Sequence, residues 1–201
     1  QRTIEGFAHV FTGWTFAGSP SFHRPSFEWL QPMQPFEAFH DTGAKTLLNG
    51  VTVAAGGTAR SDLTAALDNI FAHPNVAPFV SRQLIQRFVS SNPSPAYVER
   101  VARVFEDNGR GLRGDIGAVI KAILLDAEAR DTPTADHHGK LKEPLLRLTG
   151  LWRAYGARAT NGRYAVPGLG FLLGQAPLQS PSVFNFFRPD YAPPGEIADA
   201  G

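Results

Sequence analysis

The densest group of side chains with chemical potential lies between residues 40 and 46. Within seven positions the sequence brings together His40, Asp41, Lys45 and two threonines. An Asp beside a His can fix the tautomer of the imidazole and increase its basicity, and a nearby Lys can stabilise developing negative charge. These three residues are our catalytic candidates. The same segment also suits a simple turn, in which Asp41 bonds its own backbone around Gly43 and Lys45 forms a surface ion pair.

Familiar catalytic patterns do not fit this segment. It fails the spacing Gly-x4-Gly-Lys-Ser/Thr of a phosphate-binding loop. The chain has no Gly-x-Ser-x-Gly turn for a serine nucleophile. It has no cysteine, which excludes disulfides, thiolate zinc sites and cysteine nucleophiles. Both interpretations of residues 40–46, catalytic group and structural turn, therefore stay open.

The remaining histidines predict no metal centre. His137 and His138 are adjacent, so they diverge in an extended segment and lie about 100° apart on a helix. Asp131 and Asp136 could join them in a weak site, but the spacings His-x3-His and His-Glu-x-x-His are absent. We interpret residues 131–139 as a solvated linker and assign no cofactor.

Four further residues are candidates for binding: Trp14, His9, Asn185 and Arg188. The first two flank the end of the first expected helix and could face the segment that contains His40. Asn185 and Arg188 stand among Phe and Pro residues, where they suit buried polar anchors. An arginine there could clamp a carboxylate through two hydrogen bonds, with Asp41 and Asp190 as the alternatives.

Aromatic residues crowd the irregular stretch from residue 13 to residue 39. It contains Trp14, Phe16, Phe22, Phe27, Trp29, Phe36 and Phe39, with four prolines among them. We predict a long loop or a short β-hairpin. Exposed rings could stack on a sugar or dock on a partner. In the interpretation that we favour, the rings instead anchor an irregular backbone that has no strand ladder to hold it. Phe184, Phe186 and Phe187, beside Arg188, could belong to the same aromatic surface as the rings of residues 13–39.

The composition excludes several classes of protein. The chain has 201 residues, with 19 Lys and Arg against 18 Asp and Glu, and a formal net charge of +1. This balance, without a block of basic residues, argues against a general nucleic-acid binder. No apolar run approaches the roughly 18–20 residues of a membrane helix, so we expect no membrane span in this chain.

Hydrophobic periodicity predicts a mainly α-helical fold. Helices are expected from Thr3, Ser61, Asn75, Ser94, Asp115 and Glu143, with stops at Pro74, Gly109 and Gly156 among others. Ser94-Pro95 is a strong start, because a hydroxyl caps the helix and proline at the first position loses no hydrogen bond. A brief strand is expected from Val51.

Each expected helix has an apolar stripe that we predict to face the core. The stripes contain Ile4, Phe7, Ala8 and Phe11; Leu63, Ala66, Leu67, Ile70 and Phe71; Val76, Phe79, Val80, Leu84 and Phe88; Val98, Val101, Ala102 and Phe105; and Ile116, Val119, Ile120, Ile123 and Leu124. Short connections favour antiparallel neighbours, so we predict an irregular helical bundle with aromatic loops wrapped around it. The whole chain, 1–201, is interpreted as a single domain: a helix and aromatic loop over 1–60, a helical core over 61–156, and a wrapping arm with a loose tail over 157–201.

Several unusual segments occur in an order that resembles a known family. They are Phe11-Thr-Gly-Trp-Thr-Phe, the run from His40 to Gly50, Lys140-Leu-Lys-Glu-Pro, and the stretch from Leu173 to Pro189. Together they are similar to the bacterial family known as domain of unknown function 1800, over about residues 4–194. The resemblance implies a longer protein of which this chain is the C-terminal part. It also implies export from the cytoplasm and association with a sulfatase-like protein encoded nearby. It implies no established catalytic residue.

Two functions follow from these observations. The first is an exported binding or assembly module without catalysis of its own, which is favoured by the loop aromatics. The second is a hydrolase-type enzyme that uses His40, Asp41 and Lys45. The enzyme requires His40 and Asp41 to converge in a pocket with another polar group, whereas the binding module requires an exposed apolar patch.

Overall fold

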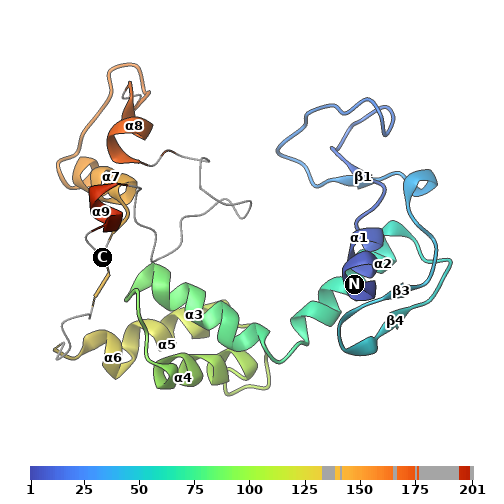
Figure 1. Ribbon diagram of the computed structural model, residues 1–201, viewed down its shortest axis with the longest axis horizontal. Helices are drawn as coiled ribbons and strands as arrows, with labels where there is room; N and C mark the ends of the chain where they lie inside the picture. The colour runs from blue at the N-terminus through green and yellow to red at the C-terminus, as the bar shows by residue number, and fades with distance from the viewer. Residues whose placement is uncertain (133–138, 141, 165–166, 175, 177–194, 200–201) are drawn as a thin grey trace. The chain divides into compact units, whose positions relative to one another are not determined.

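The computed structural model describes residues 1–132, 139–140, 142–164, 167–174, 176 and 195–199. It confirms a mainly helical fold, with 50% helix and 7% strand. The chain divides into two compact units, Gln1–Val76 and Ala77–Gly201 (Figure 1). The interpretation of residues 1–201 as one domain stays a prediction. Over the described residues, no helix has the length and apolar character needed to cross a membrane.

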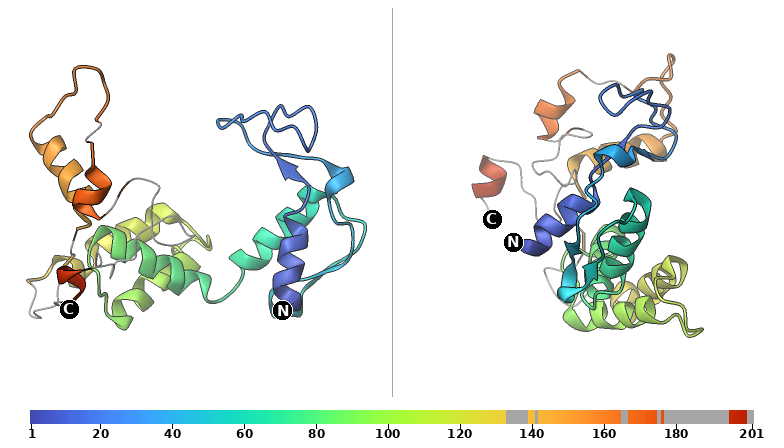
Figure 2. Two further views of the ribbon diagram at one scale, coloured as in Figure 1. Left: turned by 45° about the horizontal axis from the view of Figure 1, so that its top comes forward. Right: turned by 90° about the vertical axis from the view of Figure 1, so that its right-hand side faces the viewer.

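In the first unit, two helices and short strands surround a small apolar core. The elements are α1 (Arg2–Val10), β1 (Trp14–Thr15), β2 (Gln34–Pro35), the 3-10 turn η1 (Glu37–Phe39), β3 (Lys45–Thr46), η2 (Leu48–Gly50), β4 (Thr52–Val53) and α2 (Ala59–Phe71). Helix α1 packs against β3 and lies beside α2 (Figure 2). The core consists of Val10, Leu47 and Ala66, with Phe7 and Val53 packed around it.

Two antiparallel strand pairs organise the segment between α1 and α2. In the first, Trp14 lies opposite Pro35 and Thr15 opposite Gln34, so β1 and β2 close a long loop, which combines the two alternatives predicted for this stretch. Residues 14–35, from β1 to β2, are called the arm below. In the second pair, Lys45 of β3 lies opposite Val53 of β4, where a short strand was predicted.

The second unit is helical throughout its described elements. They are α3 (Val76–Phe88, which begins at the boundary), α4 (Pro95–Glu106), α5 (Ile116–Leu125), α6 (Ala127–Arg130), α7 (Pro144–Ala154), α8 (Leu169–Leu173) and α9 (Glu196–Asp199). Two predicted starts are confirmed: Ser94 caps α4 by accepting a hydrogen bond from the Tyr97 amide, and Asp115 caps α5. The cap of α2 is Thr58, three residues before the predicted Ser61, because Thr58 and Ser61 form a reciprocal cap.

Helices α4 and α5 form the centre of the second unit. Val101 and Phe105 of α4 are buried, as predicted, and so are Val119 and Ile123 of α5. Tyr97 is also fully buried, and its hydroxyl donates to the Ile123 carbonyl at 2.6 Å. Burial raises the pKa of Tyr97 to about 12, with smaller contributions from two nearby carboxylates. This hydrogen bond therefore ties α4 to α5.

The predicted inward stripe of the first helix is correct at Phe7, which packs against the core, and wrong at Ile4 and Phe11. Ile4 is 76% exposed and Phe11 is 49% exposed, whereas Gly6 and Val10 are buried. The cause is the close approach of α1 to β3. A Cβ on Gly6 would lie 2.1 Å from the Thr46 carbonyl oxygen, so a larger side chain does not fit there.

In helices α2 and α3 the structure buries only part of the predicted stripes. Ala66 of α2 is buried, as predicted, but Leu67, Phe71, Phe79 and Phe88 are exposed. The buried positions are Ala59, Asp62 and Ala66 in α2, and Ala77, Ser81, Ile85 and Gln86 in α3. The buried face of α2 thus combines two alanines with a charged residue, Asp62.

Candidate functional site

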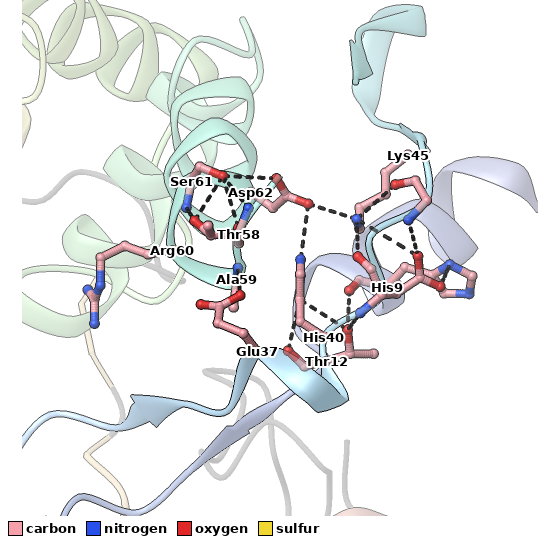
Figure 3. A network of polar contacts seen from close by, with 12 residues as sticks. His9, Thr12, Glu37, His40, Lys45, Thr58, Ala59, Arg60, Ser61 and Asp62 are labelled. Carbon is pink, nitrogen blue, oxygen red and sulfur yellow. Dashed lines mark hydrogen bonds and ion pairs between the residues drawn. The ribbon is translucent and has the colours of Figure 1, made fainter. Parts of the chain in front are cut away.

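Three elements of the first unit bring charged side chains into its interior. His40 follows η1 directly, Lys45 begins β3, and Asp62 lies in the first turns of α2. The side chains of His40 and Lys45 are fully buried, and that of Asp62 is 1% exposed. We call these three residues the buried cluster (Figure 3).

The carboxylate of Asp62 is the centre of the buried cluster. Its Oδ2 accepts a hydrogen bond from Lys45 Nζ at 2.7 Å and lies 3.1 Å from His40 Nε2. Its Oδ1 accepts from the Ser61 hydroxyl at 3.2 Å. Lys45 Nζ also donates to the backbone carbonyls of Asp41 and Gly43, so all three of its hydrogens have acceptors.

The cluster holds Asp62 in its charged form. Burial alone would raise the pKa of Asp62, because a low-dielectric interior disfavours charge. The hydrogen bonds from Lys45 and His40 and the charge of Lys45 outweigh this effect, so the pKa of Asp62 lies below its usual value. Asp62 is therefore an ionised group that accepts from Lys45 and contacts His40.

Asp41 faces the opposite way and pairs with His9. Its Oδ2 lies 2.9 Å from His9 Nδ1, and both side chains are partly exposed, at 34% and 51%. Its Oδ1 accepts from the Gly43 amide at 2.7 Å, which is the predicted turn. Lys45 Nζ lies 4.0 Å from the same oxygen.

Thr12 connects the two parts of the site. Its hydroxyl donates to the His9 carbonyl at 2.6 Å and accepts from the Asp41 amide at 2.8 Å. The same hydroxyl lies 3.3 Å from His40 Nδ1, and the Thr12 carbonyl lies 3.1 Å from that nitrogen. A single residue after α1 thus contacts both histidines of the site.

Of the three catalytic candidates, Lys45 lies near Asp41, with 4.0 Å between Nζ and Oδ1, but the side chains of His40 and Asp41 contact different partners. His40 and Lys45 meet at Asp62, while Asp41 turns to His9, a binding candidate. Lys45 is buried, contrary to the surface ion pair expected for a simple turn. Two surface hollows of about 570 and 750 Å³ lie in the second unit, and neither is lined by any of these residues. Among the described residues, no three His, Asp or Glu side chains are grouped to hold a metal ion.

Sequence reasoning missed Asp62, which directly follows the helix start predicted at Ser61. A signal was nevertheless present. Asp62 shares the i, i+3, i+4 face of α2 with Ala59 and Ala66, and a charged residue among small side chains on one helix face indicates a buried, paired charge.

The other binding candidates fall into two groups. Trp14 is partly buried, and the guanidinium of Arg60 lies 5.1 Å from its ring centroid. Its buried Nε1 has no hydrogen-bond partner among the described residues. Asn185, Arg188 and Asp190 lie outside the described residues, as do Phe184, Phe186, Phe187, Asp136, His137 and His138.

The arm presents a cluster of exposed apolar side chains. The most exposed are Phe27 at 63%, Trp29 at 74%, Leu30 at 90% and Met33 at 49%. The Phe16 ring packs edge-on against Trp29 with centroids 4.7 Å apart, and Phe27 stacks on Trp29 at 6.5 Å. We call Phe16, Phe27, Trp29, Leu30 and Met33 the arm patch. These rings pack on one another, and three of the five side chains are more than half exposed.

A comparison with curated proteins and with solved structures found no match for the chain. A comparison with protein-family models gave one finding, and it agrees with the resemblance of the spaced motifs. The model described as "Protein of unknown function (DUF1800)" matches residues 1–200, so the chain belongs to this family.

Proposed function

We propose that this protein is a binding module that docks on a partner protein through the arm patch, without catalysis at the buried cluster. The observation that carries the proposal is the exposure of Phe27, Trp29 and Leu30 on a backbone that the arm itself holds in place. The enclosure of the buried cluster supports the second half of the proposal. A substrate would have to displace His40 and Lys45 from their partners to reach it.

Polar side chains of the arm fix its backbone. The Ser26 hydroxyl donates to the Ala17 carbonyl and accepts from the Glu28 amide at 3.2 Å. The Glu28 carboxylate accepts from the Leu30 amide at 2.7 Å. Gln34 bonds the backbone of two residues across the arm, at Gly18 and Ser19. A surface that is ordered before binding loses less entropy when a partner docks.

Phe27 adds a second sign of functional constraint. Its φ is +59°, in the left-handed region that bulky residues rarely adopt. Such a conformation costs on the order of 1 kcal/mol or more and is concentrated at binding and catalytic sites. Here it places an aromatic ring beside Trp29 on the surface of the arm.

The chemistry of the arm favours a protein over a sugar or a membrane. Sugar sites combine aromatic rings with free polar groups, but Ser26, Glu28 and Gln34 are engaged with the arm's own backbone. Membrane-surface segments are usually rich in Lys and Arg, whereas the arm contains one cation, Arg24, and one anion, Glu28. An apolar, nearly neutral patch with a tryptophan matches the centre of a protein interface.

The partner proposed first is the sulfatase-like protein that the family resemblance implies, with both proteins exported. The test compares Trp29→Ala in the arm with Phe171→Ala on α8, an equally apolar side chain that is 93% exposed. Each is titrated against the purified sulfatase-like protein by calorimetry. A central interface residue contributes about 2 kcal/mol or more, so we expect Trp29→Ala to weaken binding at least about 30-fold. Phe171→Ala should bind as the unaltered chain does.

Three results would contradict the proposal. They are equal affinity of both variants, binding of the arm to neutral lipid vesicles in place of the protein, and binding of an oligosaccharide that Trp29→Ala abolishes. Circular dichroism of each variant checks that the fold is retained.

One observation favours a second candidate, a hydrolase-type activity centred on His9. Asp41 contacts His9 Nδ1, which leaves Nε2 as the basic atom of a half-exposed ring. This is the arrangement of a general base, with His9 in the place first given to His40. A panel of nitrophenyl esters, phosphates and sulfates, assayed with the unaltered chain and with His9→Gln, tests it. Turnover that His9→Gln reduces at least about 100-fold would support the enzyme.

A further inference from the structure

We infer that His40 is a buried imidazolium that links both ends of the arm to α2, so that this link weakens as pH rises. The inference rests first on the atoms around the two ring nitrogens. Its link to partner binding rests on the function proposed above.

The surroundings of His40 Nδ1 contain only acceptors. The Thr12 carbonyl, 3.1 Å away, cannot donate. The Thr12 hydroxyl, 3.3 Å away, already gives its proton to the His9 carbonyl. Nδ1 must therefore carry a hydrogen to bond either oxygen.

The second ring nitrogen, Nε2, must also carry a hydrogen. Nε2 lies 3.1 Å from Asp62 Oδ2, which is ionised and also accepts from Lys45. A bare Nε2 would set its lone pair against a carboxylate inside the protein, without water to separate them. Both nitrogens of His40 therefore donate, and the ring carries a positive charge.

His40 lies where the two ends of the arm meet. Thr12 stands two residues before β1, and His40 follows η1, the turn after β2. Between them, Gly13 accepts from the Phe36 amide at 2.8 Å. A Cβ on Gly13 would lie 2.9 Å from the His40 backbone nitrogen, so the two ends are tightly packed. Through Asp62, the imidazolium ties this junction to α2 (Figure 3).

The charged groups around His40 come from each neighbouring element. Asp62 faces it from α2, and Lys45 of β3 shares the same carboxylate oxygen. Asp41 follows it in the chain and pairs with His9 of α1. Lys45 repels a second cation, but the ionised Asp62 between them compensates both, and Asp41 lies 4.0 Å from the Lys45 ammonium.

The direction of the pH effect follows from proton counting. A histidine in an unfolded chain releases its proton near pH 6.5. Above that pH the folded protein holds one proton more than the unfolded chain, so its stability falls as pH rises. For one proton, the unfolding equilibrium constant increases by up to about tenfold per pH unit.

The protonation state can be measured directly in the unaltered chain. Long-range ¹H–¹⁵N spectra distinguish a protonated ring nitrogen from a bare one. We expect both nitrogens of His40 to be protonated at pH 7. His73 is an internal reference, because its Nδ1 accepts from the Asn75 amide at 3.1 Å and must be bare. A bare nitrogen in His40 at pH 7 would overturn the inference.

The consequence for the arm is measured by urea unfolding in a Trp152→Phe background, where the fluorescence comes from Trp14 and Trp29 of the first unit. With His40 present, the unfolding constant should rise between pH 6.5 and pH 8 by up to about 15-fold. In His40→Gln this rise should disappear, whereas the matched variant His73→Gln should retain it. Equal slopes in the three proteins would overturn the inference.

These readouts need no partner, so they stand or fall independently of the proposed function. If the sulfatase-like protein binds, its affinity should decrease over the same pH range for the unaltered chain and stay constant for His40→Gln. If both nitrogens of His40 are protonated but the affinity for the partner does not change with pH, the buried imidazolium stands and only its regulatory role is removed.

Discussion

At the scale of single residues, the buried cluster shows how a small unit can keep an ion pair and a histidine in its interior. Each polar atom has a partner, which is the condition for burying charge without a large penalty. Asp62 is the essential member because, among the described residues, it is the one carboxylate that His40 and Lys45 both contact directly. Removing its charge would leave the buried Lys45 ammonium without its closest carboxylate.

We therefore predict that Asp62→Asn destabilises the first unit by about 3–5 kcal/mol in its free energy of unfolding. The control is Asp68→Asn, an exposed carboxylate on the same helix, for which a change within about 0.5 kcal/mol is expected. Urea unfolding followed by the fluorescence of Trp14 and Trp29, with Trp152 replaced by Phe, gives both values. Equal stability of the two variants would mean that the ion pairs contribute nothing.

Acid should weaken the same contacts. The pKa of Asp62 is lowered in the folded chain relative to an unfolded value of about 3.9. Its contribution to stability is therefore complete above about pH 5 and is lost as pH falls through the unfolded value towards the lower folded one. Unfolding midpoints at pH 6, 4 and 3 should decrease more steeply for the unaltered chain than for Asp62→Asn. Parallel curves would argue against an ionised Asp62.

At the scale of elements, the sequence predicted where helices begin better than which faces they bury. Ser94 and Asp115 were located correctly because a cap depends on neighbouring residues alone. The faces of α1 and α3 were located only in part, because periodicity follows bulky side chains such as Ile4 and Phe79, whereas the structure also buries small residues such as Gly6 and Ala77. The pairing of His40 with Asp62 spans 22 residues and depends on the approach of η1 to α2, which local patterns do not encode.

Gly6 provides a test of this close packing. A Cβ at Gly6 would lie 2.1 Å from the Thr46 carbonyl oxygen, so Gly6→Ala must push α1 away from β3. We expect a loss of about 1–3 kcal/mol in the unfolding free energy. The matched variant is Gly150→Ala in α7, where a Cβ meets nothing within 4 Å. It should gain up to about 1 kcal/mol, because alanine favours helix. Thermal unfolding followed by circular dichroism measures whether Gly6→Ala lowers stability and Gly150→Ala raises it.

At the scale of the whole molecule, the chain consists of two compact units with different kinds of interior. The first contains the buried cluster and the arm, and the second is centred on Tyr97, Phe105 and Ile123. Because each interior is built from its own residues, we expect damage to one unit to stay within it.

Hydrogen exchange read by mass spectrometry can test this expectation. Asp62→Asn should raise exchange in peptides from residues 1–76 and leave α4 and α5 protected. Tyr97→Phe, which removes the hydrogen bond to Ile123 at a cost of about 1 kcal/mol, should do the reverse. Increased exchange across the whole chain in either variant would show that the units unfold together.

The position of Lys45 has a practical consequence for covalent labelling. It is the only lysine in the first unit, and its ammonium is enclosed by Asp62 and two backbone carbonyls. Lys121 and Lys142, both exposed, belong to the second unit. Acylation of lysine side chains will therefore attach a dye or a sensor surface to the second unit and leave the aromatic rings of the arm unmodified.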